Sequence, residues 1–183
     1  MKYIRIHYFL FFFIFLSSLS NADQNNLLLD NLFIKLQSIN NTNEYKKTLE
    51  KIWEIWLDPS DPDIEKDFNV ALSLMHNFQY KESIILFSKV IIMNPNFAEA
   101  WNKRATVYYL IGDYNNSIND INQTLILEPR HFGALNGLGI ILVKLKKYDE
   151  ALIIYRKILK LLPYDQEIKE KIKSIEIIKF ENI

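Results

Sequence analysis

The sequence predicts an all-α fold built from consecutive helix pairs, and three observations lead to it. Pro95, Pro129 and Pro163 lie 34 residues apart. Three tyrosines repeat with the same period, each 15 residues before one of these prolines: Tyr80, Tyr114 and Tyr148. The chain has only four glycines and five prolines, too few for the many turns of a sheet protein. Two interleaved series with one period indicate a repeat protein.

Composition places the chain among folded proteins that do not bind nucleic acid. It has 183 residues, of which 49% are hydrophobic and 24% charged, so it can form one domain with a core. The formal net charge is zero, with 22 residues of each sign, and a nucleic-acid-binding face would need an excess of basic residues. Cysteine is absent, which excludes disulfides, thiolate metal sites and a lipid-anchoring cysteine.

Residues 1–22 have the pattern of a cleavable signal peptide. Lys2 and Arg5 precede the apolar run Phe9–Leu16, and the small residues of Ser20–Ala22 predict cleavage after Ala22. An uncleaved N-terminal anchor is the alternative, but the run is shorter than the ~20 residues that span a bilayer. The richness in Asn, Ile and Lys suggests an AT-rich bacterial genome, so the sequence predicts a periplasmic or otherwise exported protein.

Residues 23–62 are expected to form an N-terminal helical pair and a linker. The apolar spacing predicts amphipathic helices over Leu27–Ile39 and Glu44–Leu57, with a turn at 40–43 and a proline-containing linker at 58–62. Trp53 and Trp56 fall on one face of the second helix. We interpret them as a packing ridge that covers the open end of the repeat stack. The alternative is an exposed aromatic ledge that binds a partner.

Residues 63–165 hold three repeats, which we place at 64–97, 98–131 and 132–165. Each is an antiparallel helix pair in which the tyrosine opens the second helix and the proline ends the unit. One helix pair cannot bury both of its apolar faces, so roughly three units must stack. Residues 166–183 then form a capping helix. Its buried stripe is expected at Ile168, Ile172, Ile175 and Ile178, and its water-facing side at Glu167, Lys169, Glu170, Lys171 and Lys173.

The repeat resembles the tetratricopeptide repeat (TPR), and named positions carry the resemblance. The large fourth residue is Trp101 and Leu135, although the first unit has Asp67 there. The small eighth and twentieth residues and the bulky twenty-fourth residue follow the family in all three units: Ala71, Ala105 and Gly139; Ser83, Ser117 and Ala151; Phe87, Ile121 and Tyr155. The resemblance implies a right-handed α-solenoid with a concave groove. The pieces KIWEIW, AEAWNKRATVYYLIGDYNNSINDI and LEPRHFGALNGLGIIL look like small exported TPR proteins of alphaproteobacteria, a likeness that adds no chemistry.

The sequence shows no catalytic or cofactor-binding pattern. It lacks a cysteine nucleophile, a Gly-x-Ser-x-Gly turn and a phosphate-binding glycine loop. His76 and His131 have no metal-ligand spacing to each other or to carboxylates. We therefore predict a protein that is not an enzyme and has no metal and no cofactor.

The resemblance assigns the candidate partner-binding residues to the first helices of the repeats. The residues we select are Asn69, Leu72, Met75, Asn102, Lys103, Thr106, Tyr109, Asn136 and Ile140, with Arg130 at a repeat junction. Asn102 and Asn136 could pair with a ligand main chain, because an amide offers donors and acceptors. The other groove positions are Glu65, Phe68, His76, Glu99, Leu110, Gly133, Gly137, Val143 and Lys144.

Two arginines leave alternatives open. Arg104 occupies a half-buried position, where it either pairs with Asp113 or Asp120 or reaches the groove to hold a carboxylate. Arg130 stands at a helix start, where the helix dipole disfavours a cation. We therefore expect Arg130 either to make a contact between repeats or to bind an acidic partner. The chaperone-tail-binding branch of the family uses lysine and asparagine at set positions. Phe68 and Leu72 occupy two of them here, so that activity is not expected.

The functional prediction is a non-catalytic module in the cell envelope that binds a peptide or protein segment in its concave groove. The alternative is a structural or adaptor subunit, docked permanently in an envelope assembly through its N-terminal aromatic helices. The expected partner is protein or peptide, with no nucleic acid and no small-molecule cofactor. A membrane would be contacted only through an uncleaved leader.

Overall fold

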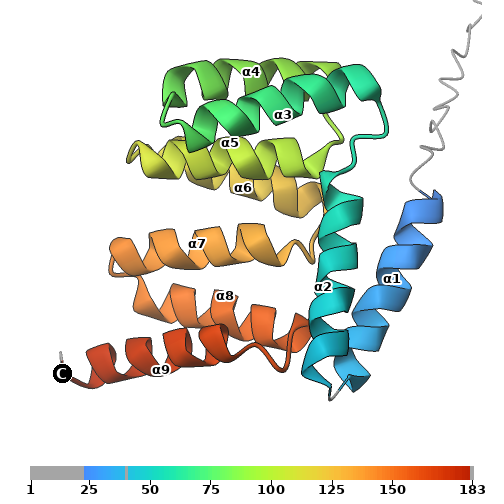
Figure 1. The fold of residues 1–183 in the computed structure, drawn as a ribbon. Helices are drawn as coiled ribbons and strands as arrows, with labels where there is room; N and C mark the ends of the chain where they lie inside the picture. Colours follow the sequence, from blue (N-terminus) through green and yellow to red (C-terminus); the bar gives the residue numbers. More distant parts are fainter. Residues whose placement is uncertain (1–22, 40, 182–183) are drawn as a thin grey trace, which may run out of the picture.

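The computed structural model describes residues 23–39 and 41–181, and the predicted leader lies outside them. Within this part of the chain every regular element is an α-helix, which confirms the all-α prediction. The helices are α1 (Asp23–Ser38), α2 (Thr42–Leu57), α3 (Pro62–His76), α4 (Tyr80–Met93), α5 (Ala98–Leu110), α6 (Tyr114–Leu127), α7 (Phe132–Lys144), α8 (Tyr148–Leu161) and α9 (Gln166–Glu181) (Figure 1). No described helix has both the length and the apolar character needed to cross a membrane.

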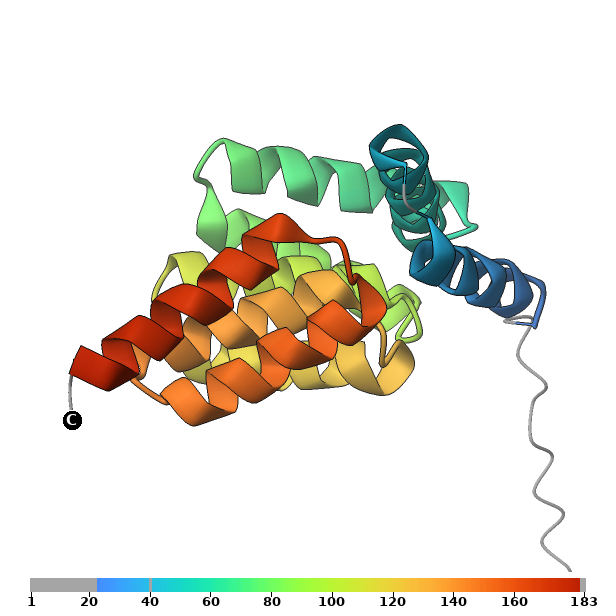
Figure 2. The ribbon, with the colours of Figure 1, turned by 90° about the horizontal axis from the view of Figure 1, so that it is seen from below.

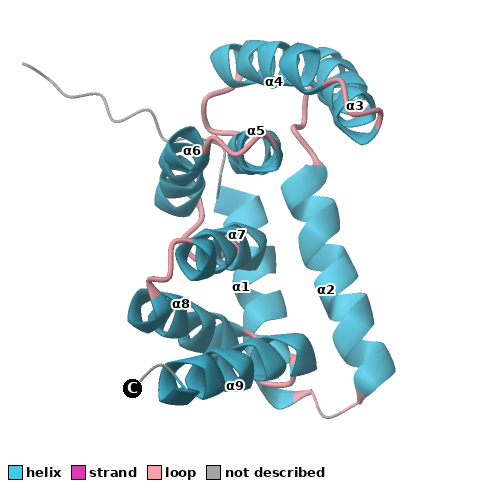
Figure 3. Ribbon diagram, turned by 90° about the vertical axis from the view of Figure 1, so that its left-hand side faces the viewer, coloured by secondary structure: helices cyan, strands magenta, loops and turns pink. Residues whose placement is uncertain are grey.

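Three helix pairs, α3–α4, α5–α6 and α7–α8, stack into a solenoid. The first helices of the pairs line one side and the second helices the other, and α9 continues the row of first helices (Figure 3). Serines tie the two helices of a pair together at their closest approach. Ser83 Oγ donates to the Ala71 carbonyl at 2.9 Å, and Ser117 Oγ donates to the Ala105 carbonyl at 2.8 Å. The small residues of the repeat therefore allow helices to touch, as the sequence pattern predicts.

The turn inside each pair has the same geometry in all three units. One residue of each turn has a positive φ, and these residues are 34 positions apart: Phe78 (60°), Gly112 (81°) and Lys146 (58°). The next amide donates to the carbonyl five residues earlier, at 2.9, 2.9 and 2.8 Å in chain order. This hydrogen bond closes the end of a helix. The residue with positive φ is in the left-handed conformation, which glycine adopts without steric cost. Two of the three units place a residue with a side chain there.

Side-chain caps fix where other helices begin. Asn41 Oδ1 accepts from the Asn43 and Glu44 amides at 2.9 and 3.1 Å, so α2 begins two residues before the predicted Glu44. Asp61 caps α3 in the same way, and Pro62 occupies the first helical position, where it loses no intrahelical hydrogen bond.

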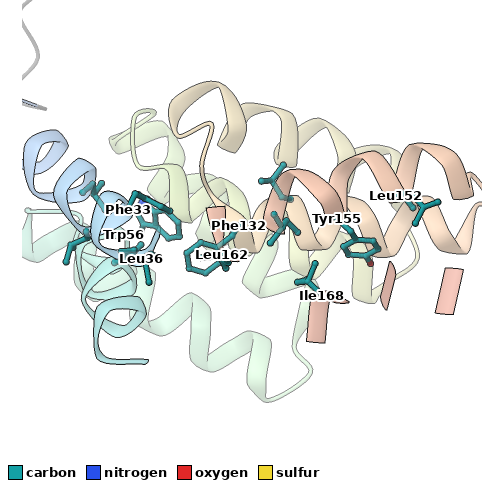
Figure 4. Close-up of a cluster of buried hydrophobic side chains, with 14 of the residues drawn as sticks. Phe33, Leu36, Trp56, Phe132, Leu152, Tyr155, Leu162 and Ile168 are labelled. Carbon is teal, nitrogen blue, oxygen red and sulfur yellow. The ribbon is translucent and has the colours of Figure 1, made fainter. Parts of the chain in front are cut away.

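The N-terminal pair does not lie where the sequence interpretation put it. We expected it to cover the open end of the stack, beside the first repeat. Instead α2 runs across the ends of α5 and α7, and α1 packs beside α2 and against α8 (Figures 1 and 2). One hydrophobic cluster joins this pair to the last repeat and to α9. Figure 4 shows Phe33, Leu36 and Trp56 of the pair beside Phe132 and Leu162 of the repeats.

Packing explains this placement. The Trp56 ring stacks on the His131 ring with centroids 4.2 Å apart, and Trp53 meets Phe132 edge to face at 5.2 Å. At the open end of the stack, α3 exposes mostly polar residues such as Lys66, Asn69 and Ser73. Trp53 and Trp56 thus form a packing ridge, as we favoured, but against the second and third repeats.

Candidate functional site

A hollow of about 260 Å³ opens on the concave side between α5 and α7. It brings together five of the ten selected candidates: Asn102, Thr106, Tyr109, Asn136 and Ile140. The rest of its lining is largely apolar or small and comes from Ala105, Leu110, Ser117, Ile121, Gly133, Gly137 and Ile141. The hollow can therefore accept apolar side chains and offers a few polar groups to a main chain.

A second hollow, of about 450 Å³, lies between α7, α8 and α9. Its lining is Ile140, Val143, Lys144, Tyr155, Glu167, Glu170, Lys171, Ser174, Ile175 and Ile178. Ile140 belongs to both hollows, so together they form one groove across α5, α7 and α9. Burial, followed by the nearby charge of Glu167 and then Tyr109, raises the pKa of Tyr155 to about 12, so its ring stays neutral.

Sequence reasoning missed the contribution of α9 to the groove. We treated α9 as a cap with Glu167, Glu170 and Lys171 facing water. In the structure Lys171 Nζ donates to Asn136 Oδ1 at 2.9 Å and pairs with Glu167 at 2.6 Å, and its side chain is 26% exposed. The signal was present: a fourth 34-residue unit starting at Gln166 puts these residues at groove positions.

Glu99 is buried, although its position belongs to the groove set. Its Oε2 accepts from Asn102 Nδ2 at 2.9 Å, and Lys103 Nζ lies 2.9 Å from Oε1. His131 Nδ1 accepts from the Ala134 amide, so the ring proton sits on Nε2, which donates to Glu99 Oε2 at 2.8 Å. Burial alone would raise the pKa of Glu99, but the His131 hydrogen bond and the Lys103 charge outweigh it and lower the pKa.

The reason for this burial is α2, which covers the groove positions nearest the starts of α5 and α7. Lys103 Nζ lies 5.6 Å from the Trp53 ring centroid, and a Cβ added to Gly133 would meet Trp53 Cη2 at 2.8 Å. Asn102 is only 7% exposed, and its amide nitrogen already donates to Glu99. The Asn102 amide nitrogen is therefore engaged within the protein and not with a ligand main chain, while Asn136 keeps an amide group in the groove.

The three candidates from the first repeat do not line either hollow. Asn69 is exposed on α3, and Leu72 and Met75 pack against the hydrophobic cluster around Phe68 and Phe87. The first unit contributes less because Phe68, at a groove position, turns into the core and is 1% exposed.

Arg104 proves to be structural. Its Nε and Nη2 donate to Asp120 at 2.7 and 2.8 Å, and its Nη1 donates to Ser88 at 2.8 Å, which links the first two repeats. Burial would lower the pKa of Arg104, but the bidentate Asp120 partner raises it. Of the two acids we proposed, Asp120 is the partner.

Arg130 also lies away from both hollows. Its guanidinium donates to Glu128 at 2.9 and 3.0 Å, pairs with Asp30 of α1, and stacks 4.7 Å from the Phe33 ring centroid. The hydrogen bond to Glu128, set against partial burial, raises the pKa of Arg130. The role of Arg130 that the structure displays is to fasten α1 to the repeats, so its assignment to the groove is corrected.

Comparison with known proteins finds relatives with the same kind of repeat. The family model described as anaphase-promoting complex, cyclosome, subunit 3 matches residues 76–158. A TPR repeat-containing protein of Rhizobium etli is 28% identical over 147 residues, which are 80% of this chain and 72% of that protein. The chain is similar to TPR proteins. Hsp70-Hsp90 organizing protein 1 of Glycine max is 28% identical over 138 residues, 75% of this chain but only 23% of that protein.

Solved TPR domains share the fold of this chain. The Sgt2 TPR domain from Aspergillus fumigatus aligns with a TM-score of 0.61 and 18% identity over 67% of this chain and 82% of that domain. The first TPR of Spaghetti (RPAP3), bound to the HSP90 peptide SRMEEVD, aligns with a TM-score of 0.60 and 20% identity over 63% and 94%. These likenesses support the predicted solenoid.

Proposed function

We propose that this protein is a non-catalytic interaction module that binds a peptide or protein segment in the groove across α5, α7 and α9. The observation that carries the proposal is the pair of hollows that meet at Ile140. Ligand-binding sites are typically concave, with a mostly apolar lining and a few polar groups. The peptide bound by the similar TPR of Spaghetti (RPAP3) adds support from the family.

The polar groups of the groove suit a main chain. Thr106 Oγ1 donates to the Asn102 carbonyl at 3.0 Å, which leaves its oxygen able to accept. Asn136 Oδ1 accepts from Lys171, which leaves its amide nitrogen as the donor. One acceptor on α5 and one donor on α7 match the two groups that every peptide unit presents.

We place the protein in the cell envelope, exported by its leader. The support is in the sequence: the basic start, the apolar run Phe9–Leu16 and the small residues before Asp23. Sequencing the N-terminus of the protein recovered from a periplasmic extract should give Asp23. Retention in the cytoplasm with Met1 intact would contradict export.

The alternative, a subunit docked through its N-terminal aromatic helices, lacks the surface we expected for it. Trp56 is 7% exposed, and the Trp53 ring packs on His131 and Phe132. The apolar residues that the N-terminal pair does expose are Leu27, Leu28, Ile34 and Leu57. A docking role would have to use these residues.

A peptide selection tests the groove proposal. The full chain would select binders from a random dodecapeptide library displayed on phage, and affinities would be measured by fluorescence anisotropy. Thr106→Trp fills the hollow between α5 and α7 and should weaken binding at least about tenfold. Asn119→Trp, on the exposed side of α6, is the matched control and should change nothing. Failure to enrich any peptide, or equal binding by both variants, would overturn the proposal.

A further inference from the structure

The hollow between α7 and α9 differs from the rest of the groove in its charges. Lys144 and Glu170 both line it, both are exposed, and neither has an ion pair within the described chain. The other charges in the lining are engaged, because Lys171 binds both Glu167 and Asn136. The hollow thus offers one free cation and one free carboxylate around an apolar floor that includes Val143, Tyr155 and Ile175.

These two charges stand at opposite ends of the hollow. The helices α7 and α9 run in the same direction (Figure 1), and Lys144 is the last residue of α7 whereas Glu170 lies in the second turn of α9. In the 34-residue frame Glu170 is level with Asn136, eight residues before Lys144 on α7. At 1.5 Å per residue, the separation along the helix axes is about 12 Å.

The spacing of the two charges fits a short extended segment. An extended chain advances about 3.3–3.6 Å per residue, so about 12 Å corresponds to three or four residues. A bulky apolar side chain between two charged residues at that spacing would fill the floor and pair both rim charges.

We propose that the hollow between α7 and α9 is the anchor site for an extended peptide. The peptide carries a large aliphatic or aromatic residue between an acidic residue, which pairs with Lys144, and a basic residue three or four positions away, which pairs with Glu170. This inference rests on the proposed groove function and specifies its ligand. A fatty acyl chain would fill the apolar floor but has no group to pair with Glu170, so the charges favour the peptide.

The same dodecapeptide library tests this assignment with a second pair of variants. Ser174→Trp places a large side chain in the hollow, and Lys173→Trp, one residue away and exposed, is the matched control. The peptides selected by the unaltered chain should lose affinity for Ser174→Trp by roughly tenfold to 100-fold, the equivalent of burying one large apolar side chain. Their affinity for Lys173→Trp should be unchanged.

A charge reversal tests the orientation. Selection by Lys144→Glu should replace the acidic residue of the enriched peptides with a basic one and leave the apolar residue in place. The anchor site is refuted if Thr106→Trp weakens binding but Ser174→Trp does not, an outcome that leaves the groove function intact. Enriched peptides without a bulky apolar residue, or without acidic enrichment that reverses in Lys144→Glu, also overturn it. Binding of palmitate with no peptide enriched would assign the hollow to a lipid and refute both proposals.

Discussion

Replacing Gly139 with alanine should destabilise the protein, although alanine is the better helix former. A Cβ at this position would lie 2.7 Å from Cε1 and Cζ of Tyr155 and 3.1 Å from its hydroxyl. Both contacting carbons belong to a rigid ring that is 2% exposed, so the whole ring must shift to admit the methyl group. Overpacking costs about 1–3 kcal/mol, against about 0.5–1 kcal/mol gained in helix propensity. We expect a net loss of about 1–2 kcal/mol, or roughly 3–6 °C in Tm.

Denaturation by urea and by heat, followed by circular dichroism, measures this loss, and the same helix supplies a control. A Cβ on Gly137 would meet Ile121 Cδ1 at 3.5 Å, an ordinary contact, so Gly137→Ala should stabilise by about 0.5–1 kcal/mol. In the second repeat the equivalent positions are Ala105 and Ile121, so Tyr155→Ile should relieve the clash. The double variant Gly139→Ala/Tyr155→Ile should lose about 1 kcal/mol less unfolding free energy than the two single variants lose together. If Gly139→Ala gains stability as Gly137→Ala does, the packing explanation is wrong.

Three further predictions follow from the turns, from Glu99 and from α2. Lys146 has φ 58°, so Lys146→Gly should stabilise the protein by about 0.5–1 kcal/mol in urea denaturation, and a loss would argue against strain at this turn. The pKa of Glu99 is lowered below its ordinary value of 4.5, so its stabilising contribution is complete above that pH and is lost as the pH falls through the folded-state pKa. The unfolding free energy should therefore decrease as the pH is lowered beneath about 4.5. This decrease should be less steep in Glu99→Gln. Equal slopes in the two proteins would show that Glu99 is not charged in the folded protein. Gly133→Ala brings a methyl within 2.8 Å of Trp53, so it should shift tryptophan fluorescence to the red and cost about 1–3 kcal/mol, and an unchanged spectrum would mean that α2 lies elsewhere.

Local chemistry explains why the helices could be predicted. The tyrosines begin α4, α6 and α8, and the small residues at Ala71 and Ala105 meet the serines of the next helix, as the repeat requires. These interactions lie within one unit, so they are encoded by spacing along the chain. Of the predicted groove residues, Thr106, Tyr109, Asn136 and Ile140 line the hollow between α5 and α7, and their role in binding a partner stays a prediction. The sequence limited the ion-pair partner of Arg104 to two acids, Asp113 and Asp120. Only the packing of the helices shows that the partner is Asp120.

The sequence by itself determined the repeat, its helix pairs and the side of the solenoid that forms a groove. The tertiary structure decided which parts of the groove are open. Spacing does not reveal that α2 lies on the second and third repeats, because that contact joins Trp53 and Trp56 to His131 and Phe132 across more than 70 residues. The contact buries Glu99 and Asn102 and leaves the groove to α5, α7 and α9. Apolar surfaces far apart in the chain are matched by shape, and shape exists only after the helices have folded and packed.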